Sequence, residues 1–242
     1  MIVLKLGGSV LTDKSKPETL DEATLARAAN AIAGFEERVV LVHGGGSFGH
    51  HHASEHGISS ETGSHDIEGA LAVHDAMVRL NDALLDAFGE RDVPALPVQP
   101  LSAAARDESA DLSLATDAVG TMLDEGFLPV VQADVIAHAG TGVTVVSGDE
   151  LTVTLAEQLG ADRVGMCSAV PGVFDTEGEV IDRIESFEEV RAALGESDAI
   201  DVTGGMTGKI RALLELDAPA WVFGLDRIDG FLDGESPGTQ VG

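Results

Sequence analysis

The chain has 242 residues, of which 44% are apolar, and it carries a formal charge of -28 at pH 7. This apolar content suffices for one sizeable α/β core or two fused lobes, whereas the acidic surface excludes nucleic acids and anionic membranes as partners. The acidic residues are spread along the chain, which argues against a disordered tail and indicates a salt-rich cytoplasm. A single cysteine, Cys167, excludes an internal disulfide. The short apolar N-terminus, interrupted by Lys5, fits neither a signal peptide nor a membrane span, so we expect a soluble cytoplasmic protein.

Short apolar strands alternate with segments of helical periodicity along the first 146 residues. Strands are predicted at 2–6, 39–42, 95–98 and 128–131, and a hairpin at 135–139 and 143–146. Helices are predicted from an N-cap at Asp21 to about 35, from Ser47 onward, over 66–88 and over 112–125, with a polar loop at 10–19.

The same alternation continues to the C-terminus. Helices are predicted over 147–159, 187–194 and from the glycines near 205 to about 216. Strands are predicted at 163–167, 180–184, 220–223 and 239–241. Alternating helices and apolar strands imply an α/β fold with a largely parallel sheet that is covered on both faces.

A glycine turn lies between a buried strand and a helix in the stretch from Val39 to Ala53. Its three glycines, at 44–46, lack a Cβ and therefore let the backbone approach a ligand closely. The helix that starts near Ser47 offers unpaired N–H groups and the positive end of its dipole to an anion, and His50 lies one turn into it. These features predict a phosphate site beside a proton-bearing side chain.

Two alternatives remain for this turn. Residues 44–49 also fit the G-x-G-x-x-G fingerprint, which leaves a dinucleotide-binding oxidoreductase open. That fold needs a second apolar strand about 20 residues further on, ending in an acidic residue, and residues 54–69 contain no such strand. The other alternative is a glycine turn with a structural role only.

Two further glycine turns carry lysines. Lys5 precedes one at 7–9, and Lys209 ends another at 204–208, in a chain with only four lysines. We interpret the retained lysines as compact positive charges needed for function. Turns at the carboxyl ends of parallel strands face one crevice, so three such turns suit several phosphates. The last turn is not a Walker A loop, because Thr203 and Ile210 occupy positions that need Gly and Ser or Thr.

These motifs resemble the amino acid kinase superfamily. KLGGS at 5–9, GGG at 44–46, SGD at 147–149 and GGMTGK at 204–209 occur in the expected order over essentially the whole chain. The stretch GGGSFGH at 44–50, with Lys14 upstream, is similar to that of the isopentenyl phosphate kinases, and fosfomycin kinases share a similar histidine. The resemblance implies a three-layer αβα sandwich with an open, mainly parallel sheet. It also implies an acceptor-binding lobe at 1–147 and a nucleotide-binding lobe at 148–242, on one continuous sheet.

The resemblance further implies a reaction. ATP, with Mg²⁺, would phosphorylate isopentenyl phosphate to isopentenyl diphosphate in an alternative mevalonate route to isoprenoid precursors, and the enzyme would be a homodimer. The alternative within the fold is a kinase for another small phosphate or phosphonate, of the fosfomycin type. The implied catalytic residues are Lys5, Lys14, His50, Asp149 and Lys209. The implied acceptor contacts are Gly45, His50 and Gly148, and the nucleotide contacts are Lys5, Gly7, Gly8, Ser9, Gly46, Asp175, Gly205 and Lys209.

Each implied role suits phosphoryl transfer, which needs positioning and charge neutralisation more than covalent chemistry. Lys5 and Lys209 would neutralise the transferred phosphoryl group, Asp149 would orient them, and Lys14 would bind phosphate beside the acceptor. A phosphate monoester is largely dianionic and needs no strong base, so His50 can hold it by hydrogen bonding.

Three further expectations concern the surroundings of this site. The stripe Val73, Met77 and Leu80 is predicted to receive the five-carbon tail, with ordinary core as the alternative. His50, His51 and His52, with His56 one helical turn after His52, could form a metal site, but no cysteine or obvious carboxylate partner lies nearby, so we expect none. The loop at 169–175 lacks two carboxylates of the family's D-V-D-G-V-Y-D pattern and keeps Asp175, which leaves the nucleotide preference open.

Overall fold

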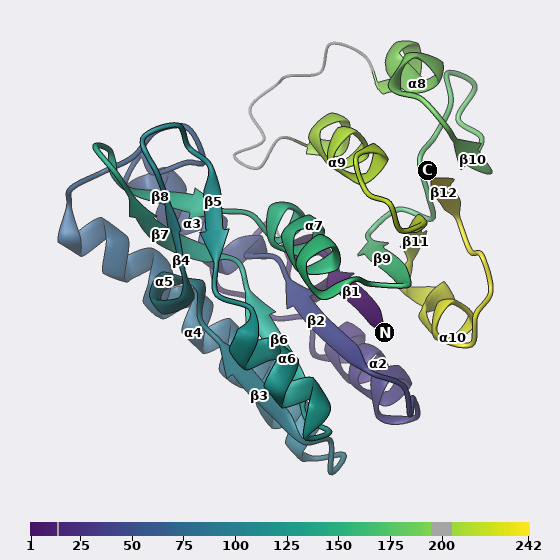
Figure 1. Cartoon of the computed structure of the whole chain (residues 1–242), viewed down its shortest axis with the longest axis horizontal. Coiled ribbons are helices and arrows are strands. Elements are labelled where there is room, and N and C mark those ends of the chain that lie inside the picture. Colours follow the sequence, from purple (N-terminus) through teal and green to yellow (C-terminus); the bar gives the residue numbers. More distant parts are fainter. Residues whose placement is uncertain (14, 195–204) are drawn as a thin grey trace.

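The computed structural model describes residues 1–13, 15–194 and 205–242. Within them, an eight-stranded sheet with the strand order β10-β12-β11-β9-β1-β2-β6-β3 has helices on both faces (Figure 1). Neighbouring strands pair in parallel, except for β11 with β12. The strands are β1 (Ile2–Leu6), β2 (Val39–His43), β3 (Ala95–Val98), β6 (Leu128–Gln132), β9 (Arg163–Ser168), β10 (Arg183–Ile184), β11 (Ala220–Gly224) and β12 (Thr239–Val241). The predicted open, mainly parallel sheet is confirmed.

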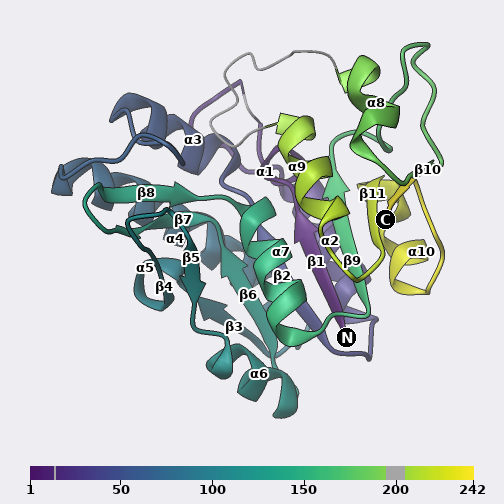
Figure 2. The ribbon, with the colours of Figure 1, turned by 45° about the horizontal axis from the view of Figure 1, so that its top comes forward.

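The helices cover the two faces because successive strand residues point to opposite sides of the sheet. Leu4 and Leu41 pack in the core beneath α2, α4 and α10, whereas Val3 and Val40 pack beneath α6, α7, α8 and α9. Figure 2 shows α7 and α9 on the same face. The helices are α1 (Gly8–Leu11), α2 (Glu22–Ala33), α3 (Gly46–Glu55), α4 (Ile67–Gly89), α5 (Pro100–Ala103), α6 (Asp117–Asp124), α7 (Gly148–Leu159), α8 (Phe187–Leu194), α9 (Gly205–Leu214) and α10 (Ile228–Leu232), with a 3₁₀ turn at Leu225–Arg227. The three-layer arrangement is therefore confirmed.

A second, smaller sheet has the strand order β5-β4-β7-β8. The hairpin of β7 (Asp134–His138) and β8 (Gly142–Val146) confirms its prediction. The helix predicted over 112–125 is wrong at its start, because β5 (Leu112–Leu114) pairs with β4 (Ala104–Arg106) and the helix begins only at Asp117. Pairing with the preceding strand outweighs the weak helical signal of three residues.

Other differences from the prediction are local. The loop expected at 10–19 begins as the last part of α1, and the strand expected at 180–184 is confined to β10. The short helix α10 was not predicted, and α9 ends at Leu214 rather than near 216. None of the helices in the described part of the chain is long and apolar enough to cross a membrane.

The sheet itself positions a site. β1 lies at its centre, with β2 on one side and β9 on the other. The chain thus leaves β1 in one direction and returns later to its opposite side, which makes this the switch point where open α/β sheets bind ligands. The division at residue 147 stays a prediction, and the sheet takes four strands from before that residue and four from after it.

Candidate active site

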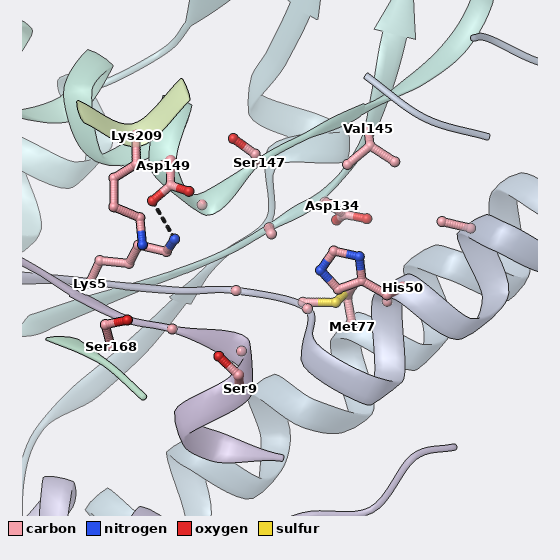
Figure 3. Close-up of a pocket in the computed structure, with 18 of the residues that line it drawn as sticks. Lys5, Ser9, His50, Met77, Asp134, Val145, Ser147, Asp149, Ser168 and Lys209 are labelled. Carbon is pink, nitrogen blue, oxygen red and sulfur yellow. Dashed lines mark hydrogen bonds and ion pairs between the residues drawn. The ribbon is translucent and has the colours of Figure 1, made fainter. Parts of the chain in front are cut away.

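A cavity of about 280 Å³ opens at the carboxyl ends of β1, β2 and β9 (Figure 3). It brings together eleven of the residues proposed from sequence, which come from all three glycine-rich turns, from the start of α7 and from α4. These residues are Lys5, Gly7, Gly8, Ser9, Gly45, His50, Val73, Met77, Gly148, Asp149 and Lys209. Segments from both halves of the chain therefore meet in one crevice, as the parallel sheet predicts.

The first two glycine turns touch each other through their backbones. A Cβ on Gly8 would lie 2.1 Å from the nitrogen of Gly46, which no side chain could tolerate. Gly46 itself has φ +49°, and a Cβ there would lie 2.1 Å from Oγ1 of Thr12. The N–H of Ser47 donates to Thr12 Oγ1 at 2.8 Å, and this hydroxyl donates to the carbonyl of Gly8. The turns are thereby fixed with the N-terminus of α3 beside the cavity, a position suited to anions.

The cationic end of the cavity is organised around Asp149. Lys5 lies on the face of β1 that packs under α7, and its Nζ donates to Asp149 Oδ1 at 2.5 Å. Lys209 extends from α9 toward the same carboxylate (Figure 3). Burial alone would raise the pKa of Asp149, but the charges of Lys5 and Lys209 outweigh it and hold this pKa below its usual value. Asp149 is thus an ionised group between two ammonium groups.

Asp149 is not the N-cap of α7. That position belongs to Ser147, whose Oγ accepts from the N–H of Glu150 at 3.1 Å. The capping requirement is therefore met by a neighbour, and the burial of Asp149 beside Lys5 has another reason than helix initiation.

The other end of the cavity is mainly apolar, although Asp134 also lies there. Met77 and Val145 lie at this end beside His50 (Figure 3), and Val73, one turn before Met77 on α4, also lines the cavity. Met77 fits closely against α3, because a Cβ on Gly49 would lie 2.7 Å from its sulfur. Leu80 does not line the cavity and packs fully buried in the core, so its place in the predicted tail wall is wrong. Leu80 lies about one helical turn beyond Met77, past the part of α4 that lines the cavity.

Two of the proposed site residues, Gly46 and Asp175, are not among the described residues that line the cavity. Gly46 packs behind Gly8, and Gly205 begins α9. Asp175 lies in an exposed turn, where its carboxylate accepts from the N–H groups of Glu177 and Glu179 at 2.8 and 2.9 Å. Lys14 lies outside the described residues, as do Thr203 and Gly204. The roles assigned to these positions stay predictions.

Sequence reasoning missed Asp134, the buried first residue of β7, which also lines the cavity. Nδ1 of His74 lies 2.8 Å from its Oδ2, and Nε2 of Gln132 donates to the same oxygen at 2.9 Å. Burial raises the pKa of Asp134, and the charge of His74 opposes that shift. The signal in the sequence was a lone carboxylate just after an apolar strand, which belongs to no glycine motif. Met206 and Ser168 also line the cavity and were not predicted.

The histidine cluster lies on the outer part of α3. Ligand atoms of His51, His52 and Glu55 lie within 4.8 Å of one another, so the expectation of no nearby carboxylate overlooked Glu55. His52 is engaged by Glu18, with Nε2 2.6 Å from Oε1. His56 instead faces Asp66 across 3.5 Å. His52 and His56 thus link α3 to neighbouring segments, whereas His51 contacts Glu55 on the same helix.

His43 is fully buried at the end of β2, directly before the glycine turn. Its Nε2 lies 3.1 Å from Oδ1 of Asn81, and its Nδ1 lies 3.3 Å from the carbonyl of Gly44. Burial lowers the pKa of His43 to about 4, so the ring is neutral at neutral pH. His43 therefore contacts the glycine turn from the buried side as an uncharged hydrogen-bonding group.

Comparison with known proteins gives a consistent picture. The sequence model of the amino acid kinase family matches residues 1–216. The isopentenyl phosphate kinase of Haloferax volcanii is 63% identical over 100% of this chain and 98% of its own length. That of Methanocaldococcus jannaschii is 31% identical over the same shares, 100% and 98%. A solved structure described as "X-ray structures of isopentenyl phosphate kinase" has a TM-score of 0.85 at 29% identity, with 100% of both chains covered.

The alternatives weighed from the sequence gain no support. In the structure α3 leads into α4, not into the second strand that a dinucleotide-binding fold requires. None of the relatives named above is an oxidoreductase or a fosfomycin kinase. Full-length identity of this degree, together with the family match, settles the assignment: the chain is a phosphotransferase that belongs to the amino acid kinase family, and within it to the isopentenyl phosphate kinases.

Proposed function

We propose that this chain transfers the γ-phosphoryl group of ATP to isopentenyl phosphate and forms isopentenyl diphosphate. The observation that carries the proposal is the composition of the cavity, which joins a cationic, glycine-lined end to an apolar end. A phosphate monoester with a five-carbon tail has the same two chemistries. The 63% identity to the isopentenyl phosphate kinase of Haloferax volcanii supports the same acceptor.

At the cationic end, Lys5 and Lys209 are proposed to neutralise the phosphoryl group as it moves between ATP and the acceptor. Asp149 holds Lys5 by the 2.5 Å hydrogen bond and supports this role by fixing the ammonium group before substrate binds. Preorganised charges of this kind contribute more than charges that must reorient during the reaction. Lys14 is proposed to bind phosphate beside the acceptor.

For the acceptor, we propose that His50 and the backbone N–H groups of Gly45 and Gly148 hold its phosphate. All three residues line the cavity, and both glycines lie at the first turn of a helix, α3 or α7. A dianionic phosphate oxygen is itself a sufficient nucleophile, so no side chain needs to remove a proton from it. Because no base is required, the lining carboxylates Asp149 and Asp134 can instead be engaged by Lys5 and His74.

For the nucleotide, we propose contacts from Gly7, Gly8, Ser9, Gly46 and Gly205. The close approach of Gly8 and Gly46 leaves bare backbone at the cavity, which fits a triphosphate. Asp175 stays proposed for the nucleotide side, and the loop at 169–175 leaves the choice of base open.

Mg²⁺ is proposed to enter with ATP rather than in a site of its own. Asp149 and Asp134 are the carboxylates among the lining residues in the described part of the chain, and they already contact Lys5 and His74. When bound to the triphosphate, Mg²⁺ supplies further neutralisation of the transferred group.

The wider setting is also proposed. The product would serve isoprenoid synthesis by an alternative mevalonate route, in the cytoplasm, and the enzyme would act as a homodimer. The charge of -28 supports a salt-rich environment, in which ions screen the acidic surface.

The test is an acceptor screen with purified protein in molar KCl, with ATP and Mg²⁺. Diphosphate formation is followed by ³¹P NMR for isopentenyl phosphate, fosfomycin and glycerol phosphate, and we expect turnover with isopentenyl phosphate. His50→Gln should lower kcat/KM for it by about ten- to a hundredfold, the worth of a charged hydrogen bond. The neighbouring His51→Gln, on the outer part of α3, is the matched control and should retain activity. No diphosphate from isopentenyl phosphate, or equal effects of both variants, would contradict the proposal.

A further inference from the structure

The apolar end of the cavity lies between two separate structural elements. Val73 and Met77 belong to helix α4, whereas Val145 belongs to the β7–β8 hairpin of the small sheet. The width of this end therefore depends on how far α4 stands from the hairpin. Apolar contacts alone specify such a distance weakly, because they have no preferred direction.

A polar contact joins these two walls. Nδ1 of His74 lies 2.8 Å from Oδ2 and 3.1 Å from Oδ1 of Asp134, at the start of β7. The carboxylate is completely buried, and the imidazole is 16% exposed. In the view of Figure 3, Asp134 lies between Val145 and Met77. The contact is thus part of the wall itself.

The carboxylate of Asp134 is fixed from the side of the strands. The N–H of Val135 donates to Oδ1 at 2.8 Å, and Nε2 of Gln132 donates to Oδ2 at 2.9 Å. Asp134 therefore cannot follow His74 if α4 moves away. A buried carboxylate that loses one of its hydrogen-bond donors is unfavourable, so the pair resists separation.

His74 is placed to transmit this constraint. It follows Val73 directly on α4 and lies one turn before Met77, the two α4 residues that line the cavity. We propose that the His74–Asp134 pair is a positioning pair, which sets the width of the apolar end and thereby the length of tail that the enzyme accepts. This inference rests on the proposed function of the cavity.

The measured quantity is the ratio of kcat/KM for geranyl phosphate to that for isopentenyl phosphate. His74→Leu removes the donor and should raise this ratio about tenfold, the lower range for one misfit methylene in an apolar pocket. His74→Asn keeps an N–H near the position of Nδ1 and should leave the ratio close to that of the unmodified protein. Met77→Ala opens the wall directly and serves as the positive control.

A matched control on the same helix distinguishes an effect on tail selection from a general loss of stability in the His74 variants. Asn81 is buried on α4 two turns beyond His74, contacts His43 and does not line the cavity. Asn81→Leu should lower the melting temperature without changing the ratio. If His74→Leu fails to fold, Asp134→Asn, which weakens the hydrogen bond from His74 with little change in shape, takes its place in the comparison.

The outcomes distinguish this inference from the proposed function. An unchanged ratio in His74→Leu or Asp134→Asn, or an equal rise in Asn81→Leu, overturns the positioning pair. If the unmodified protein phosphorylates no prenyl phosphate, the proposed function fails. Tail selection is then measured by calorimetric binding of the same two phosphates to the same variants, with the same expected shift in their affinity ratio.

Discussion

His43 should make the protein less stable as the pH falls from neutrality. The folded chain holds its imidazole neutral, with the pKa lowered from 6.5 to about 4 by burial. Below about pH 6.5 the imidazole of the unfolded chain binds a proton that the folded chain does not bind, so protonation favours unfolding. This contribution is negligible above about pH 7.5 and reaches about 2 kcal/mol at about pH 5, from the two pKa values. It grows until the pH approaches 4, where the folded ring also titrates.

The assay compares the unmodified protein with His43→Gln, because the many carboxylates also titrate in this range. Glutamine keeps hydrogen-bonding groups for Asn81 and Gly44 and does not titrate. Free energies of unfolding are measured with urea in molar KCl at about pH 7.5 and about pH 5. Lowering the pH should reduce the free energy of unfolding of the unmodified protein by about 2 kcal/mol more than that of the variant. This titration of the buried imidazole would be refuted if the two proteins lost the same free energy of unfolding between these pH values. It would also be refuted if replacing the exposed His51 by Gln had the same effect as His43→Gln.

Three further outcomes are expected. Lys209→Met should lower kcat about a thousandfold with the melting temperature retained, because a preorganised charge on the transferred group is lost; near-normal turnover would remove Lys209 from the site. Gly8→Ala should abolish activity and destabilise the fold, since its Cβ would meet Gly46 at 2.1 Å, whereas Gly34→Ala, with 3.8 Å of space, should do neither; a tolerated Gly8→Ala would refute the close approach of the turns. The melting temperature should rise between about 0.1 M and about 2 M KCl as ions screen the charge of -28, and an unchanged value would contradict that reasoning.

The large sheet was predictable because its strands are short apolar runs between helices, buried on both faces. The small sheet was harder. Leu112–Leu114 is too short to show a period, and its strand character comes from pairing with Ala104–Arg106, which the local sequence does not encode. Tertiary contacts override weak local preferences in such segments.

Some residues of the site could likewise be predicted from the sequence, and others could not. Glycine motifs and scarce lysines led to Lys5 and Lys209, because their chemistry is visible in local sequence, whereas the role of Asp149 was implied by the family resemblance. Asp134 could not be found that way, since its significance depends on His74, sixty residues earlier in the chain. Helical periodicity identified the stripe that contains Met77 and Leu80 but not the point along α4 where the cavity ends.

The central place of β1 has a consequence for how the chain folds. β1 can pair with β2 as soon as both are synthesised, but its other edge pairs with β9, which begins only at Arg163. Until then that edge exposes unpaired backbone groups in the growing chain, which favours association with other chains. Contacts over so long a separation in sequence also form slowly. The strand that carries Lys5 is therefore made long before the strand that completes its pairing.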